Sequence, residues 1–372
     1  LFNGGPGASA AFLHMGVVGP KRISFTADGR APAPPVPVVD NAETWLAWTD
    51  LVFVDPVGTG FSRAVPAPAQ EGEKQTEAER TDAANKDFFK LNRDLQTLCE
   101  FADRYLSENR LWGRPVSIAG ESYGGFRVGR LANMMQQDYG ITLSAAILIS
   151  PALEFSALGF EHHDYDVLPF VDVFPSMAAA AAFHGRSRVF DPQTPRAQVV
   201  AEAESFATTA LAQLLVQGDS AQERFRSRTL NRAASLLGLP RGVVEAAGGR
   251  IGMGVFSHRL LHDAGLVLGR YDATITGRDP YPDRENYEGP DPTLTGIDGA
   301  FRSGVNHQLR REIGLETPRR YELLSRVAGP SWQVDYEKHV LQTGIGATDD
   351  LRYGIALNPH MKVLISHGVY DL

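Results

Sequence analysis

Residues 118–125 read Ile-Ala-Gly-Glu-Ser-Tyr-Gly-Gly, and this stretch decides how the rest of the chain is interpreted. The apolar run at 115–119 predicts a short strand, and the run at 126–135 predicts a helix. The Gly-x-Ser-x-Gly pattern at 120–124 therefore occupies a tight strand-to-helix turn, where glycines avoid Cβ clashes. Such a turn lifts the Ser122 hydroxyl out of the sheet and points the next backbone N–H into the same space. We interpret Ser122 as a nucleophile rather than as a chance match between common residues.

A glycine-rich turn opens the chain. Residues 1–2 are typical of a strand end and lead into Asn3-Gly4-Gly5-Pro6-Gly7. This can be a plain turn, but consecutive glycines also let backbone N–H groups approach a ligand closely. In α/β hydrolases a glycine-rich loop after an early strand supplies the second oxyanion donor, and we favour that interpretation here.

A second glycine-rich turn follows the apolar run 51–54, which predicts another strand. It reads Asp55-Pro56-Val57-Gly58-Thr59-Gly60-Phe61-Ser62. We do not favour a phosphate-binding loop, because no Gly-Lys-Ser/Thr follows these glycines.

Strands and helices alternate through the first 150 residues. Apolar residues at helical spacing predict a long helix over 85–109, and 145–150 predicts the next buried strand. The order strand, helix, strand, turn, helix is typical of a parallel sheet. The apolar run 362–366 predicts a further core strand. We therefore predict an α/β fold of the α/β-hydrolase type, with a mainly parallel central sheet, helices on both faces and a large, mostly helical insertion.

The pattern of strand-helix alternation ends at Pro151. We divide the chain into a first core segment at 1–154, an insertion at 155–345 that forms a cap over the active site, and a return to the core at 346–372. The insertion contains helix-like runs at 177–183, 196–216 and 221–237. Residues 64–83 are polar and rich in proline, and we predict a mobile surface loop there.

Two groups of histidines lie in the insertion, His162-His163-Asp164 and the pair His258 and His262. The second pair has the i,i+4 spacing of a helical metal site, but no glutamate completes an H-E-x-x-H arrangement. We interpret these histidines as solvated or capping residues and predict neither a metal nor an organic cofactor.

Composition excludes several classes of partner. The 372 residues carry a net charge of −8, and no basic stripe indicates nucleic-acid binding. No apolar run approaches the roughly 18–20 residues that a membrane helix needs, so we expect no membrane association. Cys99 is the only cysteine, which excludes an internal disulfide. The compartment and the oligomeric state stay open.

The three glycine motifs, at 3–7, 55–62 and 120–124, together resemble those of the serine carboxypeptidases, in a disulfide-free, bacterial-like branch. The ending Val-Leu-Ile…Gly-x-x-Asp, which closes at Asp371, resembles the stretch that carries the family's catalytic aspartate. From position alone, Asp371 is equally interpretable as a helix N-cap. The resemblance covers roughly 1–20, 41–63, 84–151 and 360–372.

The resemblance implies a role for each matching residue. Ser122 would be the nucleophile and Asp371 the acid that orients a histidine base. The backbone N–H groups of Gly5 and Tyr123 would form the oxyanion hole. Asn3 and Glu121 would bind the free carboxylate of the peptide's last residue. One proton shared between Glu121 and that carboxylate would turn repulsion into a short hydrogen bond, so such a site should favour acidic pH.

The chain departs from the family at its histidine base. In the family this histidine lies some tens of residues beyond the aspartate, whereas this sequence ends one residue after Asp371. His360 and His367 are weaker candidates for the base. We expect a chain cut at both ends, with the base beyond residue 372, little activity in these 372 residues and an exposed apolar sheet edge.

The resulting hypothesis is a serine-type carboxypeptidase that releases C-terminal amino acids from peptides with a free C-terminus through an acyl-enzyme on Ser122. An esterase or acyltransferase is the first alternative, because an alcohol can intercept an acyl-serine. Val17 supports this alternative, since it stands where many family members carry a second carboxyl group. A binding module that has lost catalysis is the second alternative.

Overall fold

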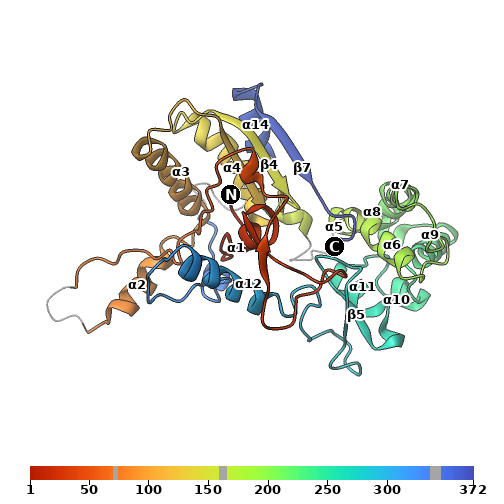
Figure 1. The fold of residues 1–372 in the computed structure, drawn as a ribbon. Coiled ribbons are helices and arrows are strands. Elements are labelled where there is room, and N and C mark those ends of the chain that lie inside the picture. Colours follow the sequence, from red (N-terminus) through yellow and green to blue (C-terminus); the bar gives the residue numbers. More distant parts are fainter. Residues whose placement is uncertain (70–73, 159–165, 336–344) are drawn as a thin grey trace. The chain divides into compact units, whose positions relative to one another are not determined.

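The structure, a computed structural model, describes residues 1–69, 74–158, 166–335 and 345–372 (Figure 1). The chain divides into two compact units, and each is described here by itself. Unit 1 consists of Leu1–Thr26, Pro32–Glu154 and Asp298–His367. Unit 2 consists of Ala27–Ala31, Phe155–Ile297 and Gly368–Leu372.

Unit 1 contains the predicted parallel sheet. Strands β3 (Val116–Glu121), β4 (Leu143–Ile149) and β7 (Lys362–Ser366) lie in the order β3-β4-β7, and both pairs are parallel. Helix α4 (Tyr123–Gln137) connects β3 to β4 and packs against both strands, and α3 (Leu91–Glu108) packs against α4 (Figure 1). The predicted α/β class is confirmed, and β7 has the predicted bounds.

Alternation and close packing account for this arrangement. In β4, Ala146 and Leu148 are fully buried, whereas the alternate residues Ala145, Ile147 and Ile149 are only partly buried, as the period of a strand requires. Helix α14 (Thr348–Leu357) packs on α4. A Cβ at Gly354 would lie 2.5 Å from the carbonyl oxygen of Ala132, so a glycine is needed where the two helices approach.

The predicted strand at 1–2 runs beside β3 and the one predicted at 51–54 runs beside Leu1, and neither forms a regular ladder. The Phe2 N–H donates to the Ala119 carbonyl at 2.9 Å, and the Glu121 N–H donates to the Phe2 carbonyl at 3.1 Å. Leu1 is hydrogen-bonded in turn to the 51–54 segment. Both segments run into glycine-rich turns almost at once, so the first contributes a single bridge, Phe2 to Gly120, and the second only its hydrogen bonds to Leu1.

Strand β7 presents an apolar edge. Within the part of the chain that the structure describes, it pairs with β4 alone. Val363, Leu364 and Ile365 are 36%, 56% and 55% exposed. The expectation of an exposed apolar sheet edge is confirmed, and such an edge is a template for pairing with another strand.

The predicted mobile loop at 64–83 is wrong in its second half. Helix α2 (Glu77–Lys86) begins there, with Thr76 as its N-cap. The Thr76 hydroxyl accepts from the Glu79 N–H, while the Glu79 carboxylate accepts from the Thr76 N–H. This capping box is a local signal for a helix start, and the polar composition concealed it.

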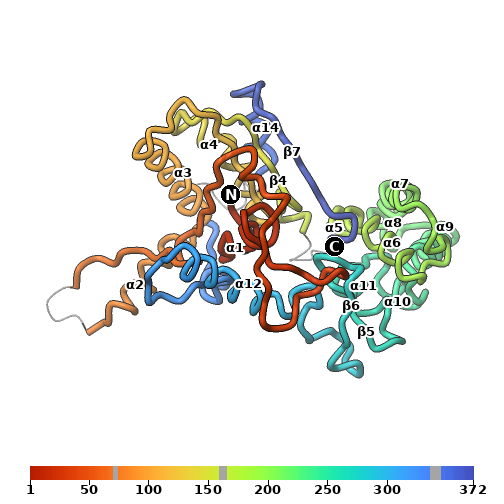
Figure 2. The backbone as a smooth tube through the Cα atoms, in the orientation of Figure 1, coloured from red at the N-terminus to blue at the C-terminus, as the bar shows by residue number. Residues whose placement is uncertain are grey.

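The remaining elements of unit 1 are short. They are α1 (Ala11–Leu13), η1 (His14–Val18), β1 (Lys21–Ile23), β2 (Val38–Asp40), η2 (Trp45–Ala47), α12 (Ile297–Asn306, whose first residue belongs to unit 2), η7 (His307–Glu312) and α13 (Ala328–Ser331). Strands β1 and β2 pair antiparallel. Figure 2 traces the irregular path of residues 48–69, on which the second glycine-rich turn lies.

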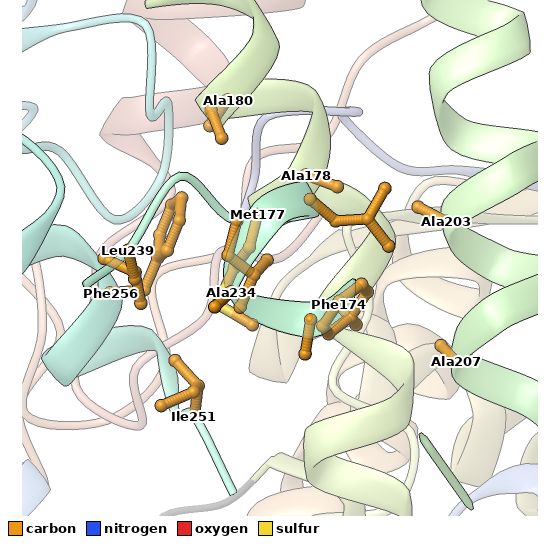
Figure 3. Close-up of a cluster of buried hydrophobic side chains, with 14 of the residues drawn as sticks. Phe174, Met177, Ala178, Ala180, Ala203, Ala207, Ala234, Leu239, Ile251 and Phe256 are labelled. Carbon is orange, nitrogen blue, oxygen red and sulfur yellow. The ribbon is translucent and has the colours of Figure 1, made fainter. Parts of the chain in front are cut away.

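Unit 2 is mostly helical around a core rich in alanine and leucine (Figure 3). Its elements are η3 (Phe155–Leu158), α5 (Leu168–Asp172), α6 (Phe174–Phe183), α7 (Arg196–Phe206), η4 (Ala207–Leu211), α8 (Ala212–Gln217), η5 (Gly218–Ser220), α9 (Glu223–Leu236), α10 (Arg241–Ala246), α11 (Met253–Arg259), η6 (His262–Ala264) and the antiparallel pair β5 (Leu266–Leu268) and β6 (Thr276–Arg278). The three predicted helix-like runs fall on α6, on α7 to α8 and on α9.

The limits of unit 2 differ from those of the predicted insertion. The unit starts at Phe155 as the insertion does, but the described residues from 298 to 345 group with unit 1. The segment 321–325 explains the difference, because it is hydrogen-bonded to both glycine-rich turns of unit 1.

One helical run is longer and more apolar than the sequence analysis allowed. Arg196–Ser220 spans 25 residues, and its most apolar window has a mean hydropathy of 1.3. By length and composition alone such a run is long enough to cross a membrane. Its buried side chains, including Val199, Ala203 and Leu211, belong to the core of unit 2.

Candidate active site

Ser122 lies at the turn between β3 and α4 in a strained backbone conformation. Its φ is 58° and its ψ is −121°, a combination that is rare for a residue with a side chain. Strain of this kind persists only where the surroundings enforce it, and it is concentrated at functional sites. A Cβ at Gly120 would overlap the carbonyl oxygen of Gly124, and a Cβ at Gly124 would meet the carbonyl oxygen of Phe2. The tight turn therefore needs both glycines of the Gly-x-Ser-x-Gly pattern.

Backbone hydrogen bonds hold the turn in place. The Ser122 N–H donates to the carbonyl of Ile149 at 3.0 Å, which ties the turn to the end of β4. The Ser122 carbonyl accepts from the N–H groups of Gly125 at 2.8 Å and of Ala152 at 3.1 Å. Ser122 itself is half-buried. Part of the Ser122 residue therefore stays accessible on a fixed turn.

The first glycine-rich turn packs directly against Ser122. A Cβ at Gly4 would lie 2.7 Å from the Ser122 Cβ and 2.9 Å from the Tyr123 nitrogen. Gly5 has a φ of 108°, a conformation that a residue with a side chain rarely adopts. The structure thus brings together the serine, the N–H of Tyr123 and the Gly4-Gly5 turn, although residues 5 and 122 are far apart in sequence.

Asn3 connects this turn to Glu121. The Asn3 side chain donates from Nδ2 to Glu121 Oε2 at 3.1 Å, and its Oδ1 accepts from the Leu13 N–H at 3.0 Å. Asn3 is almost fully buried, whereas Glu121 is half-buried. The two residues predicted to bind a substrate carboxylate therefore contact each other beside Ser122.

The sequence analysis missed a buried ion pair behind the site. Arg127 on α4 donates from Nε and Nη2 to the carboxylate of Asp94 on α3, at 2.7 and 3.0 Å. A third donor, Nη1, bonds to the carbonyl of Asn3 at 2.9 Å. Burial acts to lower the pKa of Arg127, but the Asp94 carboxylate outweighs it and holds that pKa above its ordinary value.

Tyr123 is packed from two sides. The Arg127 guanidinium lies over its ring, 4.8 Å from the centroid, and the Trp332 ring meets it edge-on at 5.4 Å. Burial raises the pKa of the Tyr123 hydroxyl well above its ordinary value, so the side chain stays neutral. The tyrosine ring thus fixes the start of α4, from which the backbone N–H of Tyr123 is presented.

The second glycine-rich turn braces the first. Asp55 Oδ1 accepts from the Ala10 N–H at 2.8 Å and from the Tyr321 hydroxyl at 3.2 Å. Burial raises the pKa of this carboxyl group. A Cβ at Gly60 would overlap the Asp55 carboxylate, which explains one glycine of the motif. Asp55 therefore contacts both the segment that follows the first turn, through Ala10, and the segment that carries Tyr321.

Of the other predicted residues, Asp371 belongs to unit 2, where its N–H donates to the Gly368 carbonyl at 3.2 Å. His360 and His367 belong to unit 1. His258 contacts Asp279 Oδ2 through Nε2 at 3.0 Å, and His262 contacts the Pro282 carbonyl. The group His162-His163-Asp164 lies outside the described residues.

His14 is a titratable group close to the first turn. Its ring stacks on Phe53 with centroids 4.4 Å apart, and burial lowers the pKa of the imidazole to about 4. The unfolded chain binds a proton near pH 6.5, whereas the folded chain binds it only near pH 4. His14 therefore leaves stability intact above about pH 6.5 and reduces it as the pH falls toward 4.

We expect His14→Phe to make unfolding less sensitive to acid. Between pH 7 and 4.5 the native protein should lose about 2.5 kcal/mol that the variant keeps. Urea denaturation at both pH values measures this difference. Asp55 has the opposite effect on the pH dependence of stability, but it is present in both proteins and its contribution cancels. His360→Gln, at an exposed histidine, is the control and should behave like the native chain. An equal loss in His14→Phe and the native protein would contradict the assignment.

A serine on a strained strand-to-helix turn, faced by a glycine-rich loop, defines the α/β-hydrolase class of fold. Residues 2–146 match the model of the family described as "Serine carboxypeptidase". The match includes all three glycine motifs, and the segment that carries Asp371 lies outside it.

Comparisons with individual proteins agree with this family. The chain is 30% identical over 136 residues to serine carboxypeptidase-like 36 of Arabidopsis thaliana, which is 36% of this chain and 23% of that protein. It is 36% identical over 83 residues to the retinoid-inducible serine carboxypeptidase of Mus musculus, which is 22% of this chain and 15% of the relative. The chain thus spans less than a quarter of the length of these relatives.

Among solved structures, the prohormone-processing carboxypeptidase Kex1(Δ)p of Saccharomyces cerevisiae aligns with a TM-score of 0.49 at 16% identity. That alignment covers 100% of this chain and 65% of the other.

Proposed function

We propose that the protein is a serine-type carboxypeptidase that releases the last amino acid of a peptide through an acyl-enzyme on Ser122. One observation carries the proposal. The strained Ser122 lies so close to the Gly4-Gly5 turn that a Cβ added at Gly4 would lie 2.7 Å from the Ser122 Cβ, so only glycine fits there. Ser122 and the backbone N–H groups of Gly5 and Tyr123 would then face the same reacting carbonyl.

The reaction follows from these groups. Ser122 Oγ attacks the carbonyl carbon of the last peptide bond, and its proton passes to a histidine oriented by Asp371. The N–H groups of Gly5 and Tyr123 stabilise the oxyanion, each worth roughly 10²–10³ in rate. The histidine returns the proton to the leaving amine, which departs as the free amino acid. Water then attacks the acyl-serine, and the peptide acid is released as Ser122 regains its proton.

Asn3 and Glu121 select peptides with a free C-terminus. Asn3 Nδ2, which donates to Glu121 in the free protein, would donate to the substrate carboxylate instead. Glu121 can share one proton with that carboxylate, because two adjacent carboxylates cannot both remain ionised at low cost. Removing this proton at higher pH restores the repulsion, so we expect selectivity for the free acid to fall as pH rises.

The ratio of kcat/KM for a blocked dipeptide to that for its C-terminal amide tests this selectivity. The titration of the catalytic histidine affects both substrates and cancels in the ratio. For the full-length protein we expect the ratio to fall at least about tenfold between pH 5 and 8. Glu121→Gln keeps a neutral hydrogen-bond donor at every pH, so its ratio should stay nearly constant.

Glu108→Gln, at an exposed residue of α3, is the matched control and should follow the native profile. A native ratio near one at every pH would sink the carboxypeptidase proposal and favour an esterase or acyltransferase on the same scaffold. A native ratio that stays well above one at every pH would instead support the carboxypeptidase proposal and contradict the shared proton.

A further inference from the structure

We propose that Arg127, held by Asp94, is a positioning residue that sets both oxyanion donors at once. The inference rests on the proposed function and deepens it, because it names what fixes the two N–H groups. Among the residues that the structure describes, Arg127 is the largest fully buried side chain, with 0% of its surface exposed, and Asp94 is 5% exposed. A fully buried guanidinium is rare unless it is paired, so a specific arrangement retains it here.

The first link runs from Arg127 to the Gly4-Gly5 turn. Arg127 Nη1 donates to the Asn3 carbonyl at 2.9 Å. The Asn3 carbonyl and the Gly4 N–H belong to one planar peptide group, so fixing the direction of one fixes the other. Gly4 lies against Ser122, and Gly5 follows it directly. Any rotation of the Asn3–Gly4 peptide would therefore displace the N–H of Gly5 from the serine.

The second link runs from Arg127 to Tyr123. The guanidinium lies 4.8 Å from the centroid of the tyrosine ring, which is within the range of a cation–π contact. Such a contact restrains the ring, and hence the first residue of α4, whose N–H is the other oxyanion donor. Arg127 thus contacts Tyr123, which carries one oxyanion donor, and Asn3, which begins the turn that carries the other donor, Gly5.

Asp94 fixes the orientation of the guanidinium. The two bonds at 2.7 and 3.0 Å form a bidentate pair, which holds the guanidinium plane as well as its position. The carboxylate cancels the charge of the arginine, so the pair acts on the oxyanion chiefly by geometry rather than by its net field. Lysine would keep the charge but could not make the bidentate pair and the third bond together.

The experiment uses the full-length protein and two readouts. The first is the rate at which a fluorophosphonate probe acylates Ser122, and the second is kcat and KM for a blocked dipeptide. We expect Arg127→Lys to lower the acylation rate and kcat about 10- to 100-fold while KM changes less than about twofold. A loss confined to kcat marks groups that act in the transition state alone.

A second variant keeps the test valid if Arg127→Lys is unstable. The pair Arg127→Met and Asp94→Leu replaces both charges with apolar groups, an exchange that is often neutral for stability. This double variant should unfold close to the native temperature yet acylate about 100-fold more slowly. Arg130→Lys is the matched control, since Arg130 lies on the same helix and pairs with Asp350 at 2.8 Å; it should acylate at the native rate.

Each outcome decides the matter. Slow acylation in a stably folded double variant supports the inference. Native acylation by that variant overturns it and leaves the proposed function intact. Absence of probe from Ser122 in the native full-length protein overturns the proposed function, and with it the role assigned to Arg127.

Discussion

Ser122→Ala is expected to lower kcat of the full-length protein by about 10⁶ and to abolish its labelling by a fluorophosphonate probe. Alanine removes the hydroxyl that would form the acyl-enzyme and retains the Cβ atom. The strained φ of 58° is therefore neither relieved nor increased, and the fold should persist. Peptide hydrolysis and mass spectrometry of the labelled protein measure the two effects.

Two other serines of unit 1 sharpen this test. Ser117 is exposed on the same strand β3, so Ser117→Ala should be labelled at the native rate. Ser150 follows β4 with a positive φ of 40°, which makes it the alternative nucleophile to check. Labelling that persists in Ser122→Ala and disappears in Ser150→Ala would identify Ser150, rather than Ser122, as the nucleophile.

Local sterics explain why much of the site could be predicted from sequence. Gly120 and Gly124 are required wherever a serine is held in so tight a turn, because a Cβ at either position would overlap the backbone. Strand β7 was predicted with its observed bounds because its five residues stand between a proline-containing turn and a glycine. Features of this kind depend on residues close together in the sequence, so a short sequence pattern is enough to predict them.

Contacts between distant segments could not be predicted in the same way. Arg127 and Asp94 lie 33 residues apart, and each occupies a helix in which a charged residue is normally expected to face solvent. The segment 321–325 joins the glycine-rich turns through isolated bridges, so it has no strand pattern that could have marked it as part of the core. The partnership of Asp371 with Ser122 stays a prediction, carried by the resemblance to the family.

Gly4→Ala is expected to lower kcat about 10²–10³-fold, the effect of losing one oxyanion donor. The added Cβ would lie 2.7 Å from the Ser122 Cβ, 2.9 Å from the Tyr123 nitrogen and 3.0 Å from the Glu121 carbonyl oxygen. Real Cβ atoms essentially never approach as closely as in the first two of these contacts, and all three neighbours belong to the rigid turn. The glycine loop must therefore move away from the serine and carry the N–H of Gly5 with it.

Measuring stability as well as kcat distinguishes a displaced oxyanion donor from a general loss of the fold. Overpacking of this kind costs roughly 1–3 kcal/mol, so the variant should remain folded at 25 °C while its kcat falls. Gly299→Ala, in α12 with open space around the new Cβ, is the control and should keep native activity and stability. Because the probe reacts through a similar oxyanion, Gly4→Ala should slow acylation by the same factor as peptide hydrolysis. Native acylation in Gly4→Ala would mean that the loop contributes no donor, and the oxyanion would then depend on the N–H of Tyr123 alone.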